Sequence, residues 1–181
     1  MNLRPPLLCP AVLVVLLSAC AGWLPLEVEG DAGAARVQLE AAAASGPVAL
    51  SVRDAPAEFP PERVAKALAE GVVGLEAQFE PTSRVRPASA LLSFAPAEPD
   101  SLCRGESATA PPASPTLLLL VWCGDGEAVA AVTVPLASTA PQEVERAIWR
   151  AARRLFPDRY AERYGIDLFG LRVGVGASIG F

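Results

Sequence analysis

Residues 116–135 read TLLLLVWCGDGEAVAAVTVP and give the clearest structural signal in the chain. Its first part, Thr116–Cys123, is a continuous apolar run, which is typical of a central strand that is covered on both faces or packed against a helical layer. Gly124–Glu127 supplies the residues of a tight connection, and Ala128–Pro135 is a second strand-like segment. The stretch therefore predicts a β-hairpin with one strand in the middle of a sheet.

Shorter patterns around the hairpin predict the rest of the domain. Val48–Arg53 and Ser89–Ala95 have the composition of strands. Apolar residues at helical spacing predict a helix over 60–81, and a second helix is expected to begin at Pro141 and to end or kink at Pro157. The sequence thus predicts the α+β class, with a mainly antiparallel sheet of four to five strands and two helices packed on one face.

The first twenty residues, MNLRPPLLCPAVLVVLLSAC, have the layout of a secretory signal peptide. Arg4 supplies a positive charge, Leu7–Leu17 is apolar apart from one proline, and the small residues Ser18 and Ala19 precede Cys20. The apolar run is too short to cross a bilayer, because about 30 Å of hydrocarbon requires roughly 20 apolar helical residues. We therefore expect a cleaved leader and no membrane span in this segment.

The end of the leader, Leu17-Ser18-Ala19-Cys20, resembles the lipobox of bacterial lipoproteins. The resemblance implies that a diacylglyceryl group is transferred to the thiol of Cys20, that the chain is cleaved before this residue and that the new N-terminus is acylated. In that class an aspartate after the cysteine implies retention in the inner membrane, so Ala21 indicates the periplasmic face of the outer membrane. The alternative is an ordinary secretory peptide in which Cys20 has no role.

With 181 residues, the chain is long enough for one domain of ordinary size. We expect a cleaved signal peptide over 1–19, a lipidated tether over 20–47 with a short helix over Ala34–Ala44, and a single α+β domain over 48–181. The segment Leu168–Phe181 alternates apolar and small residues. This pattern predicts a last strand, or an arm that docks on the sheet or on the edge of a partner.

Two cysteines, Cys103 and Cys123, remain in the mature chain besides Cys20. Export to an oxidising compartment favours a disulfide between them. The bridge would close a loop of about 20 residues, which stabilises by roughly 3 kcal/mol in the chain-entropy model. It would also attach the proline-rich segment 96–115, expected to be a long loop, to the end of the central strand. A metal site is not expected, because the chain has no histidine to complete one.

Candidate catalytic groups are few. The absence of histidine excludes Ser-His-Asp and Cys-His catalysis. Asp54, Glu58 and Glu62 are the acids from which a carboxylate pair would be drawn, but acids in a polar connection before a helix are usually solvated. Asp125 and Glu127 flank a glycine, and turn chemistry explains them without a cation. We therefore expect no catalytic residues, no cofactor and no enzymatic activity.

The mature chain is acidic, since residues 20–181 hold 14 Lys+Arg against 20 Asp+Glu. A negative chain is a poor candidate for binding nucleic acid. The second helix departs from this balance, because Arg146, Arg150, Arg153 and Arg154 form a basic stripe. Arginine side chains are suited to phosphates, so this face is a candidate contact for lipid headgroups or an anionic partner. The alternative is a solvated face with internal ion pairs.

These patterns together predict a membrane-anchored lipoprotein of the cell envelope. Its expected role is that of a non-enzymatic accessory or scaffold, which holds a protein partner of an assembly, transport or cell-wall machine near the membrane. Two alternatives stay open. One is a module that binds a small apolar ligand in a cavity between helices and sheet. The other is a periplasmic hydrolase with two carboxyl groups about 5–10 Å apart.

Overall fold

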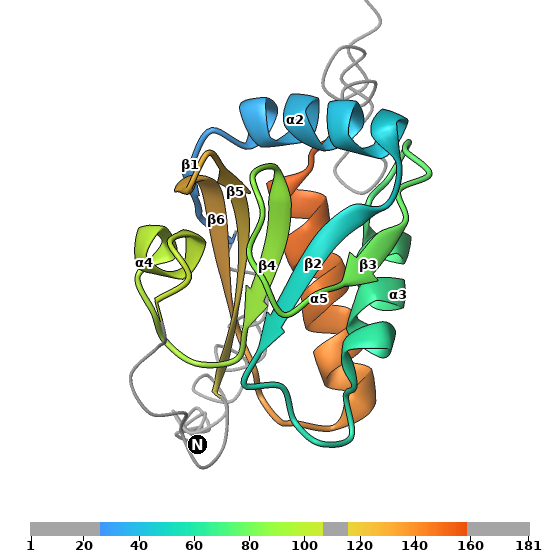
Figure 1. Ribbon diagram of the computed structural model, residues 1–181. Helices are drawn as coiled ribbons and strands as arrows, with labels where there is room; N and C mark the ends of the chain where they lie inside the picture. The colour runs from blue at the N-terminus through green and yellow to red at the C-terminus, as the bar shows by residue number, and fades with distance from the viewer. Residues whose placement is uncertain (1–25, 107–115, 159–181) are drawn as a thin grey trace, which may run out of the picture.

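The computed structural model describes residues 26–106 and 116–158, which form one six-stranded sheet with helices on both faces (Figure 1). The strands are β1 (Val28–Gly30), β2 (Val48–Arg53), β3 (Phe79–Pro81), β4 (Ser89–Ser93), β5 (Leu117–Gly124) and β6 (Glu127–Pro135). The helices are α2 (Ala32–Ser45), α3 (Pro61–Gly71), α4 (Pro99–Cys103) and α5 (Pro141–Leu155).

The predicted hairpin is confirmed as β5 and β6, which pair antiparallel at the centre of the strand order β1-β6-β5-β4-β2-β3. Its turn residues Asp125 and Gly126 both have positive φ, 53° and 88°. Two consecutive positive φ angles define the type I′ turn, whose twist matches that of the paired strands. The pairing register shifts between Trp122 and Cys123, which marks a bulge close to the turn.

The α+β class is confirmed, but the details of the sheet differ from the prediction. The sheet has six strands instead of four to five, and it is mixed, since β2 pairs in parallel with both β3 and β4. The helix α3 carries the chain from the end of β2 back to the start of β3, and the connection 82–88 brings it back again before β4, so all three strands run in the same direction. The edge strands β1 and β3 are three residues long, which is too short for an alternating pattern to be recognised.

The folded body begins well before residue 48, so most of the predicted tether belongs to the domain. The strand β1 pairs antiparallel with β6, and α2 buries Ala35 and Leu39 in the core. The junction is fixed by Asp31, whose backbone N–H donates to the carbonyl of Val129 at 2.9 Å. The side chain of Asp31 accepts from the N–H of Ala34 at 2.8 Å and caps the helix. The helix expected over Ala34–Ala44 is confirmed as α2, but its place in the domain was missed because this segment is rich in small residues and has few large apolar ones.

Two other element boundaries also differ from the prediction. The helix expected over 60–81 ends at Gly71, and Gly74 adopts a φ of 70° that glycine tolerates best. Residues further on then form β3. The proline-rich segment expected to be a loop contains α4, a helix too short to give a periodic signal. Residues 107–115 and the alternating tail Leu168–Phe181 lie outside the described residues.

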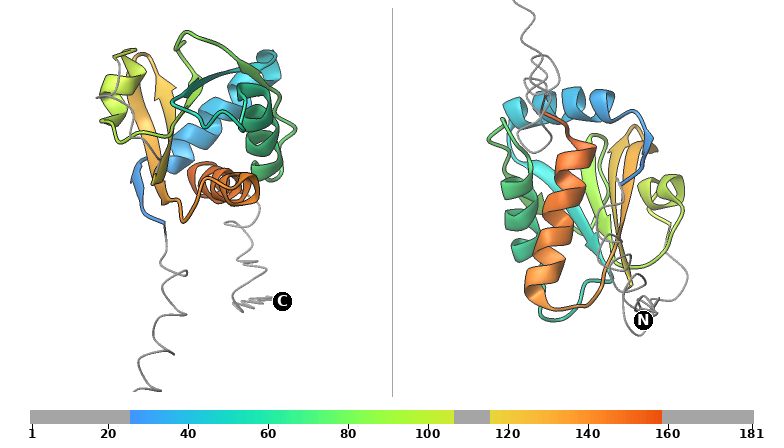
Figure 2. Two further views of the ribbon diagram at one scale, coloured as in Figure 1. Left: turned by 90° about the horizontal axis from the view of Figure 1, so that it is seen from below. Right: turned by 180° about the vertical axis from the view of Figure 1, so that it is seen from behind.

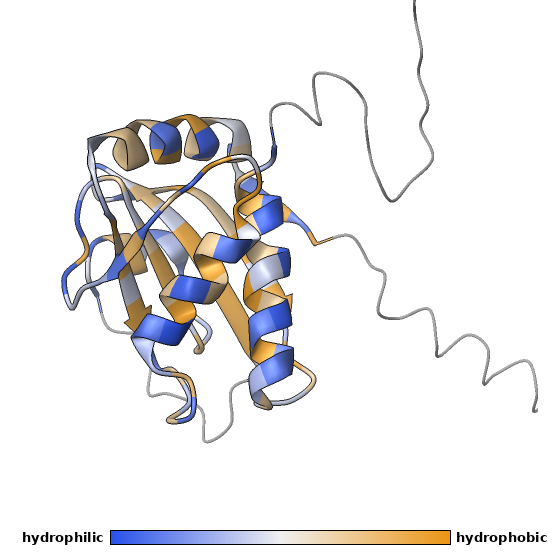
Figure 3. Ribbon diagram, turned by 90° about the vertical axis from the view of Figure 1, so that its right-hand side faces the viewer, coloured by the Kyte–Doolittle hydropathy of each residue, from blue (hydrophilic) through white to orange (hydrophobic). Residues whose placement is uncertain are grey.

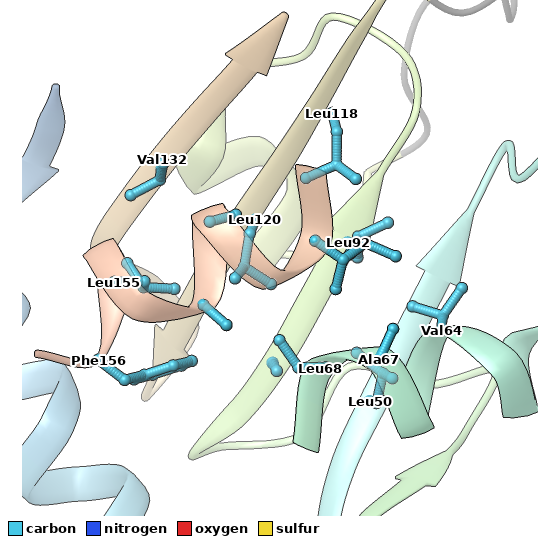
Figure 4. Packing of buried hydrophobic residues seen from close by; sticks show 14 of the residues in the cluster. Leu50, Val64, Ala67, Leu68, Leu92, Leu118, Leu120, Val132, Leu155 and Phe156 are labelled. Atoms are coloured by element: carbon cyan, nitrogen blue, oxygen red, sulfur yellow. The ribbon is translucent and has the colours of Figure 1, made fainter. Parts of the chain in front are cut away.

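The sheet separates two apolar clusters. On one face α3 and α5 lie side by side, and α2 crosses one end of the sheet (Figures 1 and 2). The core of this face includes Leu50, Leu68, Leu92, Leu120 and Phe156, all buried (Figure 4). The prediction of two helices on one face is therefore correct for α3 and α5. The opposite face carries a much smaller cluster under α4, whose members are Leu91, Leu102, Cys103, Leu119, Val121, Cys123 and Ala131.

Candidate functional site

The predicted basic stripe lies on the outer side of α5. Pro141 stands in the first turn of this helix, where its missing N–H leaves no hydrogen bond unmade. The inner side is apolar and buried, and the outward faces of the helices are hydrophilic (Figure 3). Because the buried residues recur at helical spacing, the polar residues between them share one surface. We call this surface the arginine face, and its members are Arg146, Trp149, Arg150, Arg153 and Arg154.

One carboxylate serves two arginines of this face. Arg146 Nη1 donates to Glu143 Oε2 at 2.7 Å, and Arg150 Nη2 lies 3.8 Å from Glu143 Oε1. The Nε of Arg150 is buried and has no hydrogen-bond partner within the described residues. The predicted alternative of internal ion pairs therefore holds for Arg146 and only weakly for Arg150.

The other half of the face is arranged around an aromatic ring. Trp149 is 40% exposed, and the guanidinium carbon of Arg153 lies 4.4 Å from its ring centroid. This geometry is that of a cation–π contact. Arg154 is exposed, and the ion pairs found within 26–106 and 116–158 include neither Arg153 nor Arg154. The sequence pointed to the arginines but did not anticipate their contact with Trp149.

The neighbouring helix α3 balances its own charges. Arg63 of α3 reaches Glu145 of α5 at 2.8 Å, and its guanidinium also lies 4.8 Å from the ring centroid of Phe59. Lys66 and Glu70 form an exposed pair at 3.9 Å. The pair of Arg63 with Glu145 joins α3 to α5 at the surface, and the contacts of α3 do not extend the excess positive charge beyond α5.

Charge is distributed unevenly over the described residues. The helix α5 holds four arginines and two glutamates, a net charge of +2. The described residues outside α5 hold seven Lys+Arg against sixteen Asp+Glu, a net charge of −9. The arginine face is thus a cationic surface on an otherwise acidic body, which is the distribution that directs a protein toward an anionic surface in one orientation.

The described chain begins on the same side of the sheet as α5. Leu26 and Val28 pack against the larger cluster, which fills the space between the sheet and the helices α3 and α5. Figure 2 shows the start of β1 and the helix α5 on one side of the sheet. Cys20 precedes Leu26 by six residues, which span at most about 22 Å when fully extended. Cys20 itself lies outside the described residues.

The predicted disulfide between Cys103 and Cys123 is confirmed, with a Cα–Cα distance of 5.5 Å. It joins α4 to the end of β5, next to the hairpin turn. A second link comes from Asp100, whose Oδ1 accepts the backbone N–H of Ala128 at 2.8 Å. The disulfide therefore stabilises the cover of the smaller cluster, and both cysteines are buried.

The acids considered as catalytic or cation-binding candidates all lie at the surface. Asp54, Glu58 and Glu62 are all exposed, and Glu62 stands in the first turn of α3, where the helix dipole favours an acid. Asp125 and Glu127 are exposed at the hairpin turn. Among the residues that the structure describes, there is no group of three or more His, Cys, Asp or Glu side chains that could hold a metal ion.

A buried arginine, Arg36, was not foreseen from the sequence. It is 3% exposed, and its Nη1 donates to the carbonyl of Val73 at 2.8 Å and more weakly to that of Phe156 at 3.5 Å. Its Nε donates to Glu40 at 2.8 Å. The side chain links α2 to the ends of α3 and α5, so its role is structural.

In the described parts of the chain, no helix is both long and apolar enough to cross a bilayer. Comparison of the chain with protein-family models, with curated proteins and with solved structures finds no match in any of the three.

Proposed function

We propose that this chain is a lipid-anchored protein of the bacterial envelope, in which a non-enzymatic domain holds a protein partner close to the membrane. The observation that carries the proposal is the short stretch between the lipobox cysteine and the folded body. Only five residues lie between Cys20 and Leu26, which is the first of the described residues and packs against the core. An acylated Cys20 would therefore keep the whole domain at the bilayer surface.

Two further observations support this assignment. The buried disulfide between Cys103 and Cys123 suits an oxidising compartment outside the cytoplasm. Ala21 after the lipobox cysteine favours the periplasmic face of the outer membrane over the inner membrane. Together they are consistent with a mature protein that begins at Cys20 and is exposed to the periplasm.

The non-enzymatic part of the proposal rests on chemistry. The chain has no histidine, and a carboxylate hydrolase needs an acid in a desolvated environment. The acids considered for that role, Asp54, Glu58 and Glu62, are exposed to solvent. An accessory role requires only a stable surface at a fixed distance from the membrane.

The anchor is tested by expressing the full chain with its own leader in a Gram-negative host. We expect a mature mass that begins at Cys20 and includes three acyl chains, in the outer-membrane fraction. Cys20→Ser should abolish acylation and release the protein from membranes, whereas the control Cys9→Ser, within the leader, should leave processing unchanged. A product that still carries Met1 and diffuses freely, or one cleaved without acylation, would contradict the proposal.

The accessory role is tested by crosslinking in intact cells, followed by mass spectrometry of the adducts. We expect one reproducible envelope protein to be crosslinked to the wild type and to be lost with Cys20→Ser. If adducts with the wild type and with the unanchored variant are identical, the anchor does not place the domain at its partner.

A further inference from the structure

The described body is acidic overall, and the arginine face of α5 is a cationic surface that lies on the side where the described chain begins. We infer that the arginine face rests on the phosphates of an anionic phospholipid bilayer and fixes the orientation of the anchored domain. This inference rests on the proposed function, because it assumes that Cys20 is acylated. The inference adds that the arginine face is turned toward the membrane and that its guanidinium groups recognise lipid phosphates.

The charge distribution favours this orientation. The helix α5 has a net charge of +2, and the described residues outside it have a net charge of −9. A negatively charged bilayer surface therefore attracts α5 and repels the rest of the body. The described residues outside α5, taken together, carry an excess of carboxylates that anionic phosphates repel.

The side chains of the face match the chemistry of the headgroup region. Arginine binds phosphate oxygens through two parallel N–H donors, and Arg153 and Arg154 are exposed without an ion pair within 26–106 and 116–158. Arg150 has only the 3.8 Å contact with Glu143, so its guanidinium retains donors for an incoming anion. Trp149, in cation–π contact with Arg153, presents an exposed ring with a polar edge, and tryptophan is enriched at this depth of membranes.

Because the segment between Cys20 and Leu26 is short, even a weak contact between the arginine face and the bilayer is sufficient to orient the domain. The six residue-to-residue steps from Cys20 to Leu26 span at most about 22 Å, so an anchored domain cannot move far from the bilayer. Binding of the arginine face is then an intramolecular event at high effective concentration. In this orientation α4 and the disulfide, which lie on the opposite face of the sheet, are turned away from the membrane and toward a periplasmic partner.

The test uses the full-length lipidated protein, reconstituted into vesicles that contain a small fraction of lipid with a spin label on the headgroup. Trp149 is isolated as the part of the tryptophan fluorescence that Trp149→Phe removes. In vesicles with phosphatidylglycerol we expect roughly twofold quenching of this component, because the ring lies at headgroup level. In vesicles of phosphatidylcholine alone, or at high salt, the quenching should be largely lost.

Two variants and a matched control locate the effect. Arg150→Glu/Arg154→Glu should abolish the quenching. Arg153→Gln/Arg154→Gln, which leaves the ion pairs of Glu143 in place, should reduce it. Arg84→Glu/Arg86→Glu changes the charge by the same amount as the first variant, on the exposed connection between β3 and β4, and should leave the quenching unchanged. Circular dichroism verifies that each variant is folded.

The outcomes separate this inference from the proposed function. A protein that floats with the vesicles but shows no quenching of Trp149, or equal quenching in both vesicle types, overturns the inference and leaves the anchor intact. A protein without acyl chains that fails to float overturns the proposed function itself. If charge reversal at Arg150 and Arg154 leaves quenching unchanged and instead removes the crosslinked envelope protein, the arginine face binds an acidic protein and the inference is wrong.

Discussion

The two faces of the sheet are covered by different amounts of protein and are held in different ways. The face under α2, α3 and α5 buries a large apolar cluster, and its helices are joined mainly by side-chain packing. The face under α4 buries a small cluster, and its five-residue helix is fixed by a disulfide and by Asp100. We call the side of the sheet under α4 the thin face and the side under α2, α3 and α5 the thick face. A helix as short as α4 is not stable by itself, so the thin face needs a covalent link, whereas the thick face relies on burial.

The sharpest test of this comparison uses two adjacent leucines of β5. Leu120 points into the large cluster and Leu119 into the small one, and both are buried. We expect Leu120→Ala to lower the free energy of unfolding by about 4 kcal/mol and Leu119→Ala by about 2 kcal/mol, because a cavity under a thin cover collapses more easily. Urea denaturation measures both values. Equal losses would mean that the two faces contribute alike, and the comparison would fail.

The next largest effect is expected on removal of the disulfide. Cys103→Ala/Cys123→Ala should lower the free energy of unfolding by about 3 kcal/mol, since the bridge closes a loop of 20 residues. Amide hydrogen exchange should show which part of the domain loses stability. The amides of Leu102 and Arg104, bonded within α4, should lose protection, while those of α5 should change only with global stability. Full retention of protection in α4 would show that Asp100 and packing hold the thin face without the bridge.

A smaller effect is expected where α3 meets α5. A Cβ on Gly71 would lie 2.6 Å from Ala152 Cβ and 3.1 Å from Trp149 Cα. Gly71→Ala should therefore cost about 2 kcal/mol, because the two helices must move apart. Adding Ala152→Gly makes room and should recover part of the loss, a coupling that a double-mutant cycle measures. If the two changes are simply additive, the helices are not in close contact at Gly71.

The sequence predicted the parts of the fold that have long, regular patterns. The apolar run of β5, the Asp-Gly turn and the buried stripe of α5 each gave a clear signal. The edge strands gave none, because three residues cannot show an alternation. The helix α2 was read as part of a tether, since its small residues hide how deeply Ala35 and Leu39 are buried. Its place in the domain depends on the pairing of β1 with β6, which no local pattern encodes.

The sequence predicted which residues belong to the candidate site, but it did not predict how their side chains pair on the surface of α5. Helical spacing placed the four arginines on one side of α5, and the structure confirms this placement. What the spacing cannot show is which of them are neutralised. Glu143 pairs closely with Arg146, while Arg153 packs on Trp149 instead of a carboxylate. These contacts depend on side-chain rotamers, so the three-dimensional structure is needed to see which arginines keep an uncompensated positive charge.

The smallest expected effect concerns an ion pair beside α4. Arg104 Nε donates to Glu106 Oε1 at 2.9 Å, and this hydrogen bond, with a second from Ser101, lowers the pKa of Glu106 below its ordinary value. The ionised carboxylate is thus favoured in the folded state, so its stabilisation is present above the unfolded pKa and is lost as the pH falls through the folded pKa. Both side chains are exposed, which keeps the contribution small.

Glu106→Gln isolates this contribution when urea midpoints are compared across pH. The variant should be slightly less stable than the wild type near neutral pH, and the two midpoints should converge in acid, where Glu106 is protonated in both states. Glu70→Gln, which removes an exposed carboxylate 3.9 Å from Lys66 on the thick face, is the control for the loss of one charge. If the Glu106 difference persists unchanged in acid, its carboxylate does not stabilise the thin face through charge, and the disulfide and Asp100 alone account for how α4 is held.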